Sequence, residues 1–176
     1  MLILPFVSQT ALIAAFGILA RGCATESEDE VQVQVKGLPL RFPARVYYAE
    51  EDVREGCRAG GVVAQVALCM GTRHHDGYLR QQCVRDLLPA EEPWMVPFVL
   101  QLLGEYVVEI SEHIDAAITD PPPARYVEFA AENPRYIQRL RQQATSYWNE
   151  YYRRTYPNRL EYPALRALAR LGDLTA

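Results

Sequence analysis

The hydrophobic pattern of the chain changes its period once, near residue 50, and this change constrains the fold more than any other feature. Residues 31–48, "VQVQVKGLPLRFPARVYY", alternate apolar and polar side chains and turn at Lys36-Gly37, which predicts a β-hairpin or two short strands. Pro39 and Pro43 cannot donate a ladder hydrogen bond, so the second strand is expected at a sheet edge. From Glu50 onward the apolar residues recur at helical spacing. The sequence therefore predicts a mainly α fold, a compact multi-helix bundle of about five to seven helices with a small N-terminal β-hairpin.

Proline, glycine and capping residues divide the helical part into segments. An acidic start at Glu50 favours a helix N-terminus. Gly56, Gly60 and Ala64 follow at intervals of four, where a neighbouring backbone could approach closely, or the Gly60-Gly61 pair breaks this helix. Asp76 is a candidate N-cap for the next helix. The remaining predicted helices run from Pro93 to Ile118, which is the clearest pattern, from about Pro134 to Thr155, and over "PALRALARLGD".

The chain length predicts a single domain spanning residues 1–176. Within it, residues 1–49 would hold an apolar segment and the hairpin, and residues 50–176 the helical bundle. Hydrophobic residues make up 49% and charged residues 23% of the chain, which excludes an intrinsically disordered protein.

The first 20 residues carry no charge and are long enough to span a bilayer or to act as a signal segment. However, no Lys or Arg precedes them, and Ser8-Gln9-Thr10 interrupts the apolar run. We expect a short strand ending near Val7, followed by a core helix capped by Ser8. This favours a cytoplasmic protein, with membrane anchoring or export through residues 1–20 as the alternative.

The four cysteines, Cys23, Cys57, Cys69 and Cys83, stand far apart and form no CxxC pair. This spacing argues against a zinc ribbon and a thioredoxin-like motif. We expect reduced, buried thiols that behave as small apolar side chains, and no cofactor.

The run "SYWNEYYRR", residues 146–154, combines four aromatic residues with two arginines. On a helical projection, the apolar and aromatic residues from Leu140 to Tyr152 fall within one arc of about 140°, with most arginines on the opposite side. These residues are Leu140, Ala144, Tyr147, Trp148, Tyr151 and Tyr152. A nucleic-acid stacking platform needs aromatic and basic side chains interleaved on one exposed surface. Segregation therefore predicts a core helix with a basic solvated face, and no nucleic-acid partner.

Arg141 is the exception, because it projects into the aromatic arc and needs an acceptor there. A partner is offered by Glu105, Glu109 and Glu112, which would lie within about 60° on the predicted Pro93–Ile118 helix, edged by His113. We call these four residues the acidic stripe. The pattern predicts a structural ion pair between Arg141 and this stripe.

Two groups of residues are candidates for chemistry. The acidic stripe could hold a cation, but Glu109 and His113 are four residues apart, and the Glu-x-x-His spacing of di-metal bundles is absent. His74, His75 and Asp76 could act as acid–base groups or metal ligands, with Cys69 nearby as a nucleophile, or could form a loop that leads into an Asp-capped helix. No GxSxG, HExxH, phosphate-binding or dinucleotide-binding motif occurs. We therefore expect a solvated or salt-bridged stripe, a structural His74-His75-Asp76 loop, and no metal.

The charge is unevenly spread along the chain. Residues 1–132 carry 10 Arg or Lys and 19 Asp or Glu, whereas residues 133–176 carry 8 and 3. This acidic surplus, together with the missing catalytic motifs, favours a protein-binding module that recognises a partner with a basic surface through its acidic residues. An adaptor or a toxin-neutralising protein of the immunity type would act in this way. The alternative is a small helical enzyme or metal-binding protein that uses His74, His75 and Asp76, or the acidic stripe.

Overall fold

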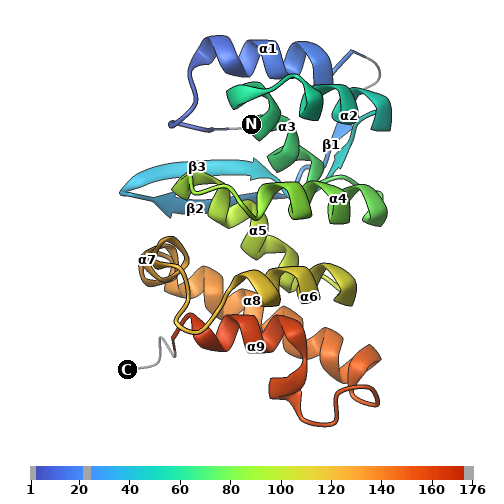
Figure 1. Ribbon diagram of the computed structural model, residues 1–176, viewed down its shortest axis with the longest axis vertical. Coiled ribbons are helices and arrows are strands. Elements are labelled where there is room, and N and C mark those ends of the chain that lie inside the picture. The colour runs from blue at the N-terminus through green and yellow to red at the C-terminus, as the bar shows by residue number, and fades with distance from the viewer. Residues whose placement is uncertain (1–2, 22–24, 173–176) are drawn as a thin grey trace. The chain divides into compact units, whose positions relative to one another are not determined.

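The computed structural model describes residues 3–21 and 25–172, which form nine α-helices and two small sheets (Figure 1). The prediction of a mainly α fold with a small N-terminal hairpin is confirmed. The α-helices outnumber the five to seven expected, because glycine, proline and loop residues split two of the longer predicted segments. No α-helix within these ranges is long and apolar enough to cross a membrane.

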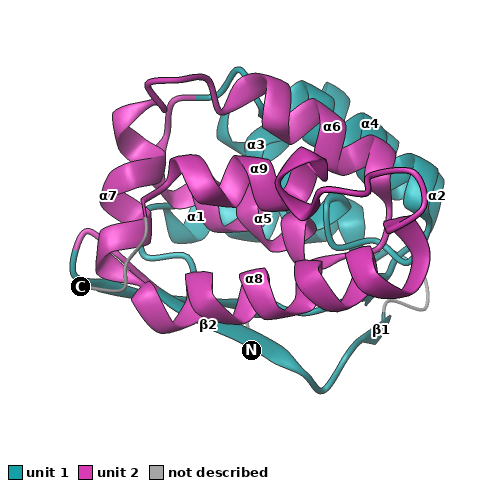
Figure 2. Cartoon of the chain, turned by 90° about the horizontal axis from the view of Figure 1, so that it is seen from below, with its two compact units in different colours: residues 1–33, 37–90 teal, residues 34–36, 91–176 magenta. Residues whose placement is uncertain are grey.

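The chain folds into two compact units (Figure 2). Unit 1 comprises residues 1–33 and 37–90, and unit 2 comprises residues 34–36 and 91–176. The helices that follow residue 50 are therefore divided between the units. The expectation that residues 1–176 behave as one domain stays a prediction.

Unit 1 begins with the predicted Ser8 cap, but the expected strand is reduced to an isolated bridge, and the buried residues of the following helix are Ala15 and Leu19. Ile3 forms a β-bridge with Arg41, and helix α1 (Gln9–Leu19) starts where the Ser8 hydroxyl accepts a hydrogen bond from Ala11 N. Strands β2 (Glu30–Val35) and β3 (Leu38–Pro43) pair around Lys36 and Gly37, which both have positive φ. Positive φ at both central residues is the conformation of a tight hairpin turn. A second pair joins β1 (Thr25–Glu26) to β4 (Val46–Tyr47).

Helix α3 (Gly61–Gly71) forms the centre of unit 1, because its sequence carries no charge. It packs against α1, α2 (Glu50–Arg58) and α4 (Gly77–Leu87). The break between α2 and α3 falls at Gly60, whose φ of 79° suits glycine. Gly56 also allows a close approach, since a Cβ built there would lie 2.8 Å from Ala67 Cβ. Gly60 therefore breaks the helix, and Gly56 allows the close approach of α3.

Unit 2 is built from several short helices and one long one. Its first half contains η1 (Pro93–Met95), α5 (Val96–Gln101), η2 (Leu102–Gly104) and α6 (Val108–Ala117). Its second half contains α7 (Ala124–Glu132), α8 (Pro134–Tyr147), the π-helix η3 (Trp148–Tyr152), η4 (Arg159–Glu161) and α9 (Pro163–Arg170). Helix α8 packs on η2, α7 and α9, and α6 packs on α9.

The prediction of one continuous helix from Pro93 to Ile118 is wrong, because the chain leaves helical geometry after Gly104. Gly104 is buried against α8, where a Cβ would lie 2.5 Å from Gln143 Oε1 and 2.8 Å from Leu140 Cδ2. The next residue, Glu105, is extended, with φ −112° and ψ 167°. Tertiary packing against α8 therefore sets the break, although the local apolar pattern continues across it.

Asn133 holds the end of strand β2 within unit 2. Its Oδ1 accepts a hydrogen bond from Gln34 N, and its Nδ2 donates to Gln34 O, each at 2.8 Å. The same Nδ2 donates to Phe129 O at 2.9 Å, at the C-terminal end of α7. One buried amide thus satisfies three backbone groups, which explains why residues 34–36 join unit 2.

Candidate functional site

A cluster of tyrosines on unit 2 forms the most distinctive surface feature of the described residues. Tyr106, Tyr147, Tyr151 and Tyr152 line an open cavity of about 440 Å³, which we call the tyrosine pocket. Tyr106 and Tyr151 are 56% and 64% exposed, which is unusual for such large apolar side chains. The tyrosine pocket therefore presents aromatic faces to solvent.

Ring contacts fix the shape of the tyrosine pocket. Tyr147 lies 6.1 Å from Tyr106 and stacks 6.2 Å from Tyr151, measured between ring centroids. Tyr152 stacks at 5.2 Å on Tyr162, which is fully buried and anchors the cluster to the core of unit 2. The hydroxyl of Tyr152 also donates to the carbonyl oxygen of Tyr106. The pocket is thus held in place before any ligand arrives, which lowers the entropic cost of binding.

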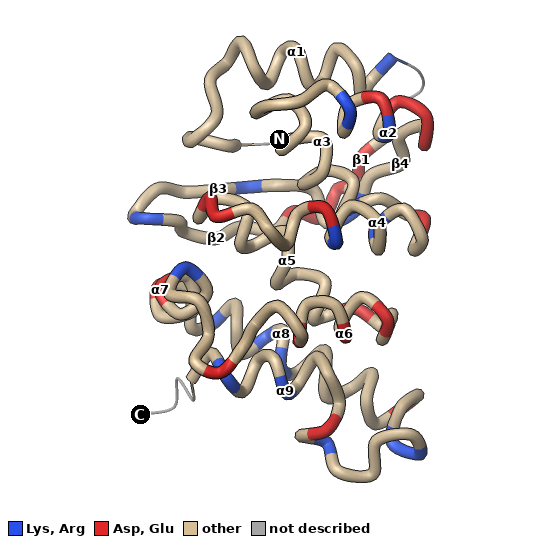
Figure 3. The backbone as a smooth tube through the Cα atoms, in the orientation of Figure 1, with Lys and Arg blue, Asp and Glu red and all other residues tan. Residues whose placement is uncertain are grey.

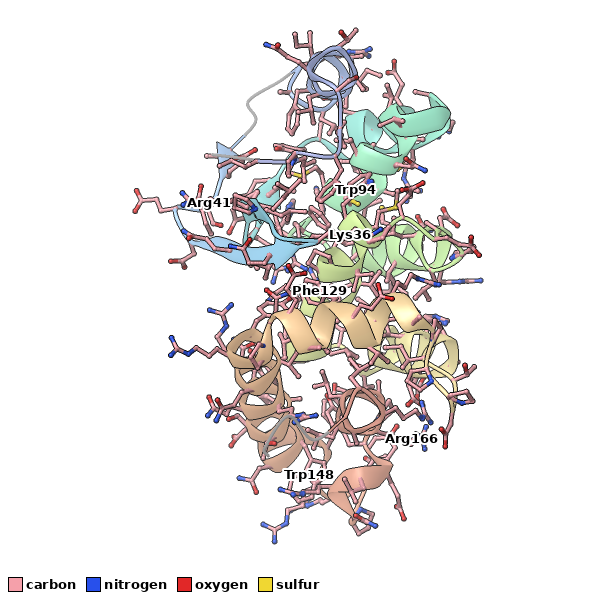
Figure 4. The ribbon with its side chains drawn as sticks, turned by 90° about the vertical axis from the view of Figure 1, so that its left-hand side faces the viewer. Lys36, Arg41, Trp94, Phe129, Trp148 and Arg166 are labelled. Atoms are coloured by element: carbon pink, nitrogen blue, oxygen red, sulfur yellow. The ribbon has the colours of Figure 1, made fainter. Side chains whose placement is uncertain are left out.

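The π-helix carries two of the pocket tyrosines, Tyr151 and Tyr152. A π-turn inserts an extra residue into a helix and shifts the positions that follow it to another face. Trp148 Nε1 donates to Tyr156 O at 2.8 Å, which closes the turn after the helix. Figure 4 places Trp148 and Arg166 at the same end of unit 2. π-turns are often found at functional sites.

The prediction that this aromatic arc lies in the core is wrong beyond Ala144. Leu140 and Ala144 are fully buried, as predicted, but none of the five π-helix residues is buried. The projection assumed regular α-helical geometry through Tyr152, and the π-turn ends that regularity. Tyr162 and Leu168 of the C-terminal segment are fully buried.

The acidic stripe is only partly assembled, because the break after Gly104 removes Glu105 from the helix. Glu105 is buried before α6, whereas Glu109 and Glu112 are exposed on α6, and His113 is half-buried. The Glu112 carboxylate accepts a hydrogen bond from the Tyr156 hydroxyl at 3.3 Å. Acidic positions are visible along α6 in Figure 3. Two members of the stripe therefore stand beside the tyrosine cluster.

The pKa values of two tyrosines report this proximity. Burial, followed by the negative charge of Glu109, raises the pKa of Tyr152. Burial, followed by Glu112, raises the pKa of Tyr156. Both phenols therefore stay neutral at physiological pH, and a carboxylate acts on each of them.

A second open cavity, of about 460 Å³, adjoins the first through Tyr151 and is lined also by Asn149, Glu150, Arg153 and Arg154. The guanidinium of Arg153 lies 5.8 Å from the Trp148 ring centroid, over its face. Basic and aromatic side chains are thus closer together here than the sequence projection indicates. Glu150 lines the same cavity, so the charge on this side is mixed.

Arg141 is half-buried, and its Nη2 donates to the carbonyl oxygens of Leu168 and Gly172. These carbonyls lie at the C-terminal end of α9, where a cation is favoured. The residue therefore has a structural role at this helix end. Its ion pair with the acidic stripe stays a prediction.

The sequence analysis missed the ion pairs of Asp115. This buried carboxylate accepts from Arg166 Nη2 at 2.5 Å and from Arg170 Nη1 at 2.8 Å, and thereby joins α6 to α9. The four-residue spacing of Arg166 and Arg170 was the available signal, since it places both side chains on one helix face.

His74, His75 and Asp76 form a structural loop. His74 is buried, its Nε2 lies 2.9 Å from Tyr48 O, and its Nδ1 accepts from Asp76 N at 3.0 Å. Burial lowers the pKa of His74, and these bonds fix the neutral tautomer with the proton on Nε2. Asp76 caps α4 by accepting from Leu79 N at 2.8 Å, and this bond lowers the pKa of Asp76. Exposed His75 stacks on Tyr47 at 5.3 Å.

The candidates for metal binding and catalysis gain no support from this geometry. Within the described ranges, no three His, Cys, Asp or Glu side chains are grouped to hold a metal ion. Both ring nitrogens of His74 face backbone groups, so its side chain is not available as a base without rearrangement.

The described cysteines, Cys57, Cys69 and Cys83, are free thiols. Cys69 and Cys83 are buried, as predicted, whereas Cys57 is only half-buried. Cys23 lies outside the described residues.

No protein-family model, no curated protein and no solved structure matches this chain.

Proposed function

We propose that the chain is a protein-binding module without catalytic activity, and that it holds a cationic side chain of its partner in the tyrosine pocket. The observation that supports this is the position of four tyrosine rings around one open cavity, with Glu109 acting on Tyr152 at its edge. Aromatic faces attract Lys, Arg and quaternary ammonium groups, and nearby carboxylates strengthen that attraction.

The composition of this surface suits a binding interface. Tyrosine, tryptophan and arginine supply most of the affinity at protein interfaces, because they bury a large area at low entropic cost. Glu109 and Glu112 would steer a basic partner toward the pocket and speed association. A partner of this type agrees with an adaptor or a toxin-neutralising role of the immunity type.

A single-stranded nucleic acid is the competing partner, because Tyr151, Arg153 and Arg154 lie together at the neighbouring cavity. The carboxylates favour the protein partner. Glu109, Glu112 and Glu150 flank the aromatic cluster and would repel a phosphate backbone.

The test is a titration of the full chain with fluorescent oligolysine, oligoglutamate and oligothymidylate probes. We expect oligolysine to bind, with an affinity that falls as salt rises, and the other two probes to bind far more weakly. Tyr151→Ala should weaken oligolysine binding about tenfold or more. Preferential binding of oligothymidylate would replace the protein-binding proposal with a nucleic-acid one.

The matched control is Tyr78→Ala. Tyr78 is 82% exposed but lies on α4 of unit 1, away from the tyrosine pocket in sequence and unit. Its removal should leave oligolysine affinity unchanged. Equal losses in the Tyr151 and Tyr78 variants would mean that the probe binds by unspecific charge, and the proposed site would be wrong.

A further inference from the structure

Two cysteines that are far apart in the sequence meet in unit 1. Cys57 lies on α2 and Cys83 on α4, and their side chains come close enough for each to shift the pKa of the other. Both line a cavity of about 200 Å³, together with Arg54, Arg58 and other residues of the same two helices. Cys83 is 2% exposed, whereas Cys57 is half-buried and reachable from the cavity.

Gly71 of α3 makes this meeting possible. A Cβ at Gly71 would lie 2.3 Å from Cys83 Sγ and 3.2 Å from Cys83 Cβ, so only glycine leaves room for the thiol. The sequence analysis missed the pair because it searched for short cysteine spacings, whereas here two helices bring together residues 57 and 83.

The surroundings shift the pKa values of the two thiols in opposite directions. The interaction with Cys83 lowers the pKa of Cys57, with smaller contributions from the positive charges of Arg54 and Arg58. Burial of Cys57 and the negative charge of Asp86 oppose this effect. The interaction with Cys57, followed by burial, raises the pKa of Cys83. Cys57 is therefore the more readily ionised thiol, and only a thiolate attacks a disulfide.

We propose that Cys57 and Cys83 form a redox site, in which Cys57 attacks an anionic low-molecular-weight disulfide and Cys83 then closes an internal disulfide. The chemical class of the oxidant follows from the charges around the cavity. Arg54 and Arg58 line it against one acid, Asp86. Arg54 is paired with Glu50, so Arg58 is the group that would attract carboxylates of the incoming molecule. Oxidised glutathione has this chemistry. The inference is independent of the tyrosine pocket, which belongs to unit 2.

The reaction consists of two exchange steps. The Cys57 thiolate attacks one sulfur of the small disulfide, whose S–S bond breaks, and the departing thiolate takes up a proton. Cys83 then gives up its proton, its thiolate attacks the Cys57 sulfur of the mixed disulfide, and the proton ends on the second departing thiolate. The protein loses two protons and two electrons in total, and one small disulfide is reduced to two thiols. A reducing thiol reverses both steps.

The test uses the full wild-type chain, incubated with oxidised glutathione and then analysed by intact mass and peptide mapping. We expect the mass to fall by two hydrogen atoms, the free thiols to fall from four to two, and one linked peptide pair to contain Cys57 and Cys83. Dithiothreitol should restore the original mass. A stable mixed disulfide that never closes, or a disulfide that involves Cys23 or Cys69, would overturn the proposal.

Variants separate the two steps. Cys57→Ser should abolish the reaction, Cys83→Ser should stop it at the glutathione adduct, and Cys69→Ala should leave it unchanged. Circular dichroism checks that each variant folds. If a variant does not fold, the peptide mapping of the oxidised wild-type chain still decides whether Cys57 and Cys83 form the disulfide.

Two arginine variants test the role of charge at the cavity. Arg58→Ala should slow oxidation by glutathione disulfide several-fold but not oxidation by cystamine, a cationic disulfide. Arg85→Ala, on the exposed side of α4 and outside the cavity lining, should change neither rate. Equal rates for both disulfides in the wild-type chain would overturn the assignment of an anionic oxidant.

Discussion

At Gly71, the absence of a side chain decides how α3 and α4 pack, and the effect is measurable. Gly71→Ala should destabilise the protein by about 1–3 kcal/mol, because the added Cβ would overlap Cys83 Sγ and touch Val53 Cγ1. Urea unfolding gives the free-energy change.

Gly17→Ala is the control for this substitution. Gly17 also lies inside a helix of unit 1, but a Cβ there would meet nothing within 4 Å. It should stabilise the protein by about 0.5–1 kcal/mol, since alanine loses less backbone entropy in a helix. The same sign for both variants would contradict the packing described at Gly71.

His74 makes the stability of unit 1 depend on pH. Burial lowers its pKa in the folded state, and Glu50, His75 and Asp76 are the other charged or titratable groups that act on it. The unfolded chain therefore binds the proton first, so stability is present above about pH 6.5 and is lost as the pH falls toward the lowered pKa. Chemical unfolding at about pH 7.5 and 5.5 should show this loss.

Substitution assigns that pH dependence to one residue. His74→Gln should reduce the difference in unfolding free energy between the two pH values. His75→Gln should keep most of it, because burial, and not the charge of His75, is the largest cause of the lowered pKa of His74. An unchanged difference in the His74 variant would mean that other groups cause the dependence.

Among the helices, two N-caps that were predicted from sequence should differ in strength. Asp76 accepts from Leu79 N at 2.8 Å, whereas Ser8 accepts from Ala11 N at 3.3 Å. Asp76→Ala should therefore cost about 1 kcal/mol, and Ser8→Ala clearly less. Thermal unfolding of both variants checks the order.

The Asp76 contribution should also vanish in acid. Its pKa is lowered by the hydrogen bond from Leu79 N, so the cap stabilises the helix above about pH 4 and is lost as the pH falls through the lowered value. Equal losses for the Asp76 and Ser8 variants at neutral pH would contradict the geometric distinction.

For the whole molecule, a single domain requires that the two units unfold together. Both tryptophans, Trp94 and Trp148, belong to unit 2, so their fluorescence reports on that unit. Circular dichroism reports on the helices of both. Because strand β2 supplies residues to each unit, we expect the two signals to change at the same urea concentration. Separated midpoints would show that the units unfold independently.

Asn133 provides the matching variant. Asn133→Ala removes three hydrogen bonds to backbone groups and should cost about 1–3 kcal/mol, with both signals shifting together. Asn149→Ala, at an exposed position of the π-helix, should shift neither signal.

Local features of the fold were predictable from the sequence alone. The hairpin turn at Lys36-Gly37, the caps at Ser8 and Asp76, and the helical class depend on residues within one or two turns of each other. The Asp76 cap follows the His74-His75 loop in the position that the sequence indicates. In each case the stabilising partner lies nearby in the chain.

The candidate sites, by contrast, were decided by the tertiary structure. The break at Gly104 depends on α8, and the exposure of Tyr151 depends on a π-turn that a regular projection cannot contain. Cys83 reaches the cavity that it shares with Cys57 because α3 offers a glycine beside it. The sequence by itself determined which segments become helices, since hydrogen bonding and side-chain periodicity act over a few residues. Which side chains meet was decided by packing between helices, because the energies of those contacts depend on residues that are distant in the chain.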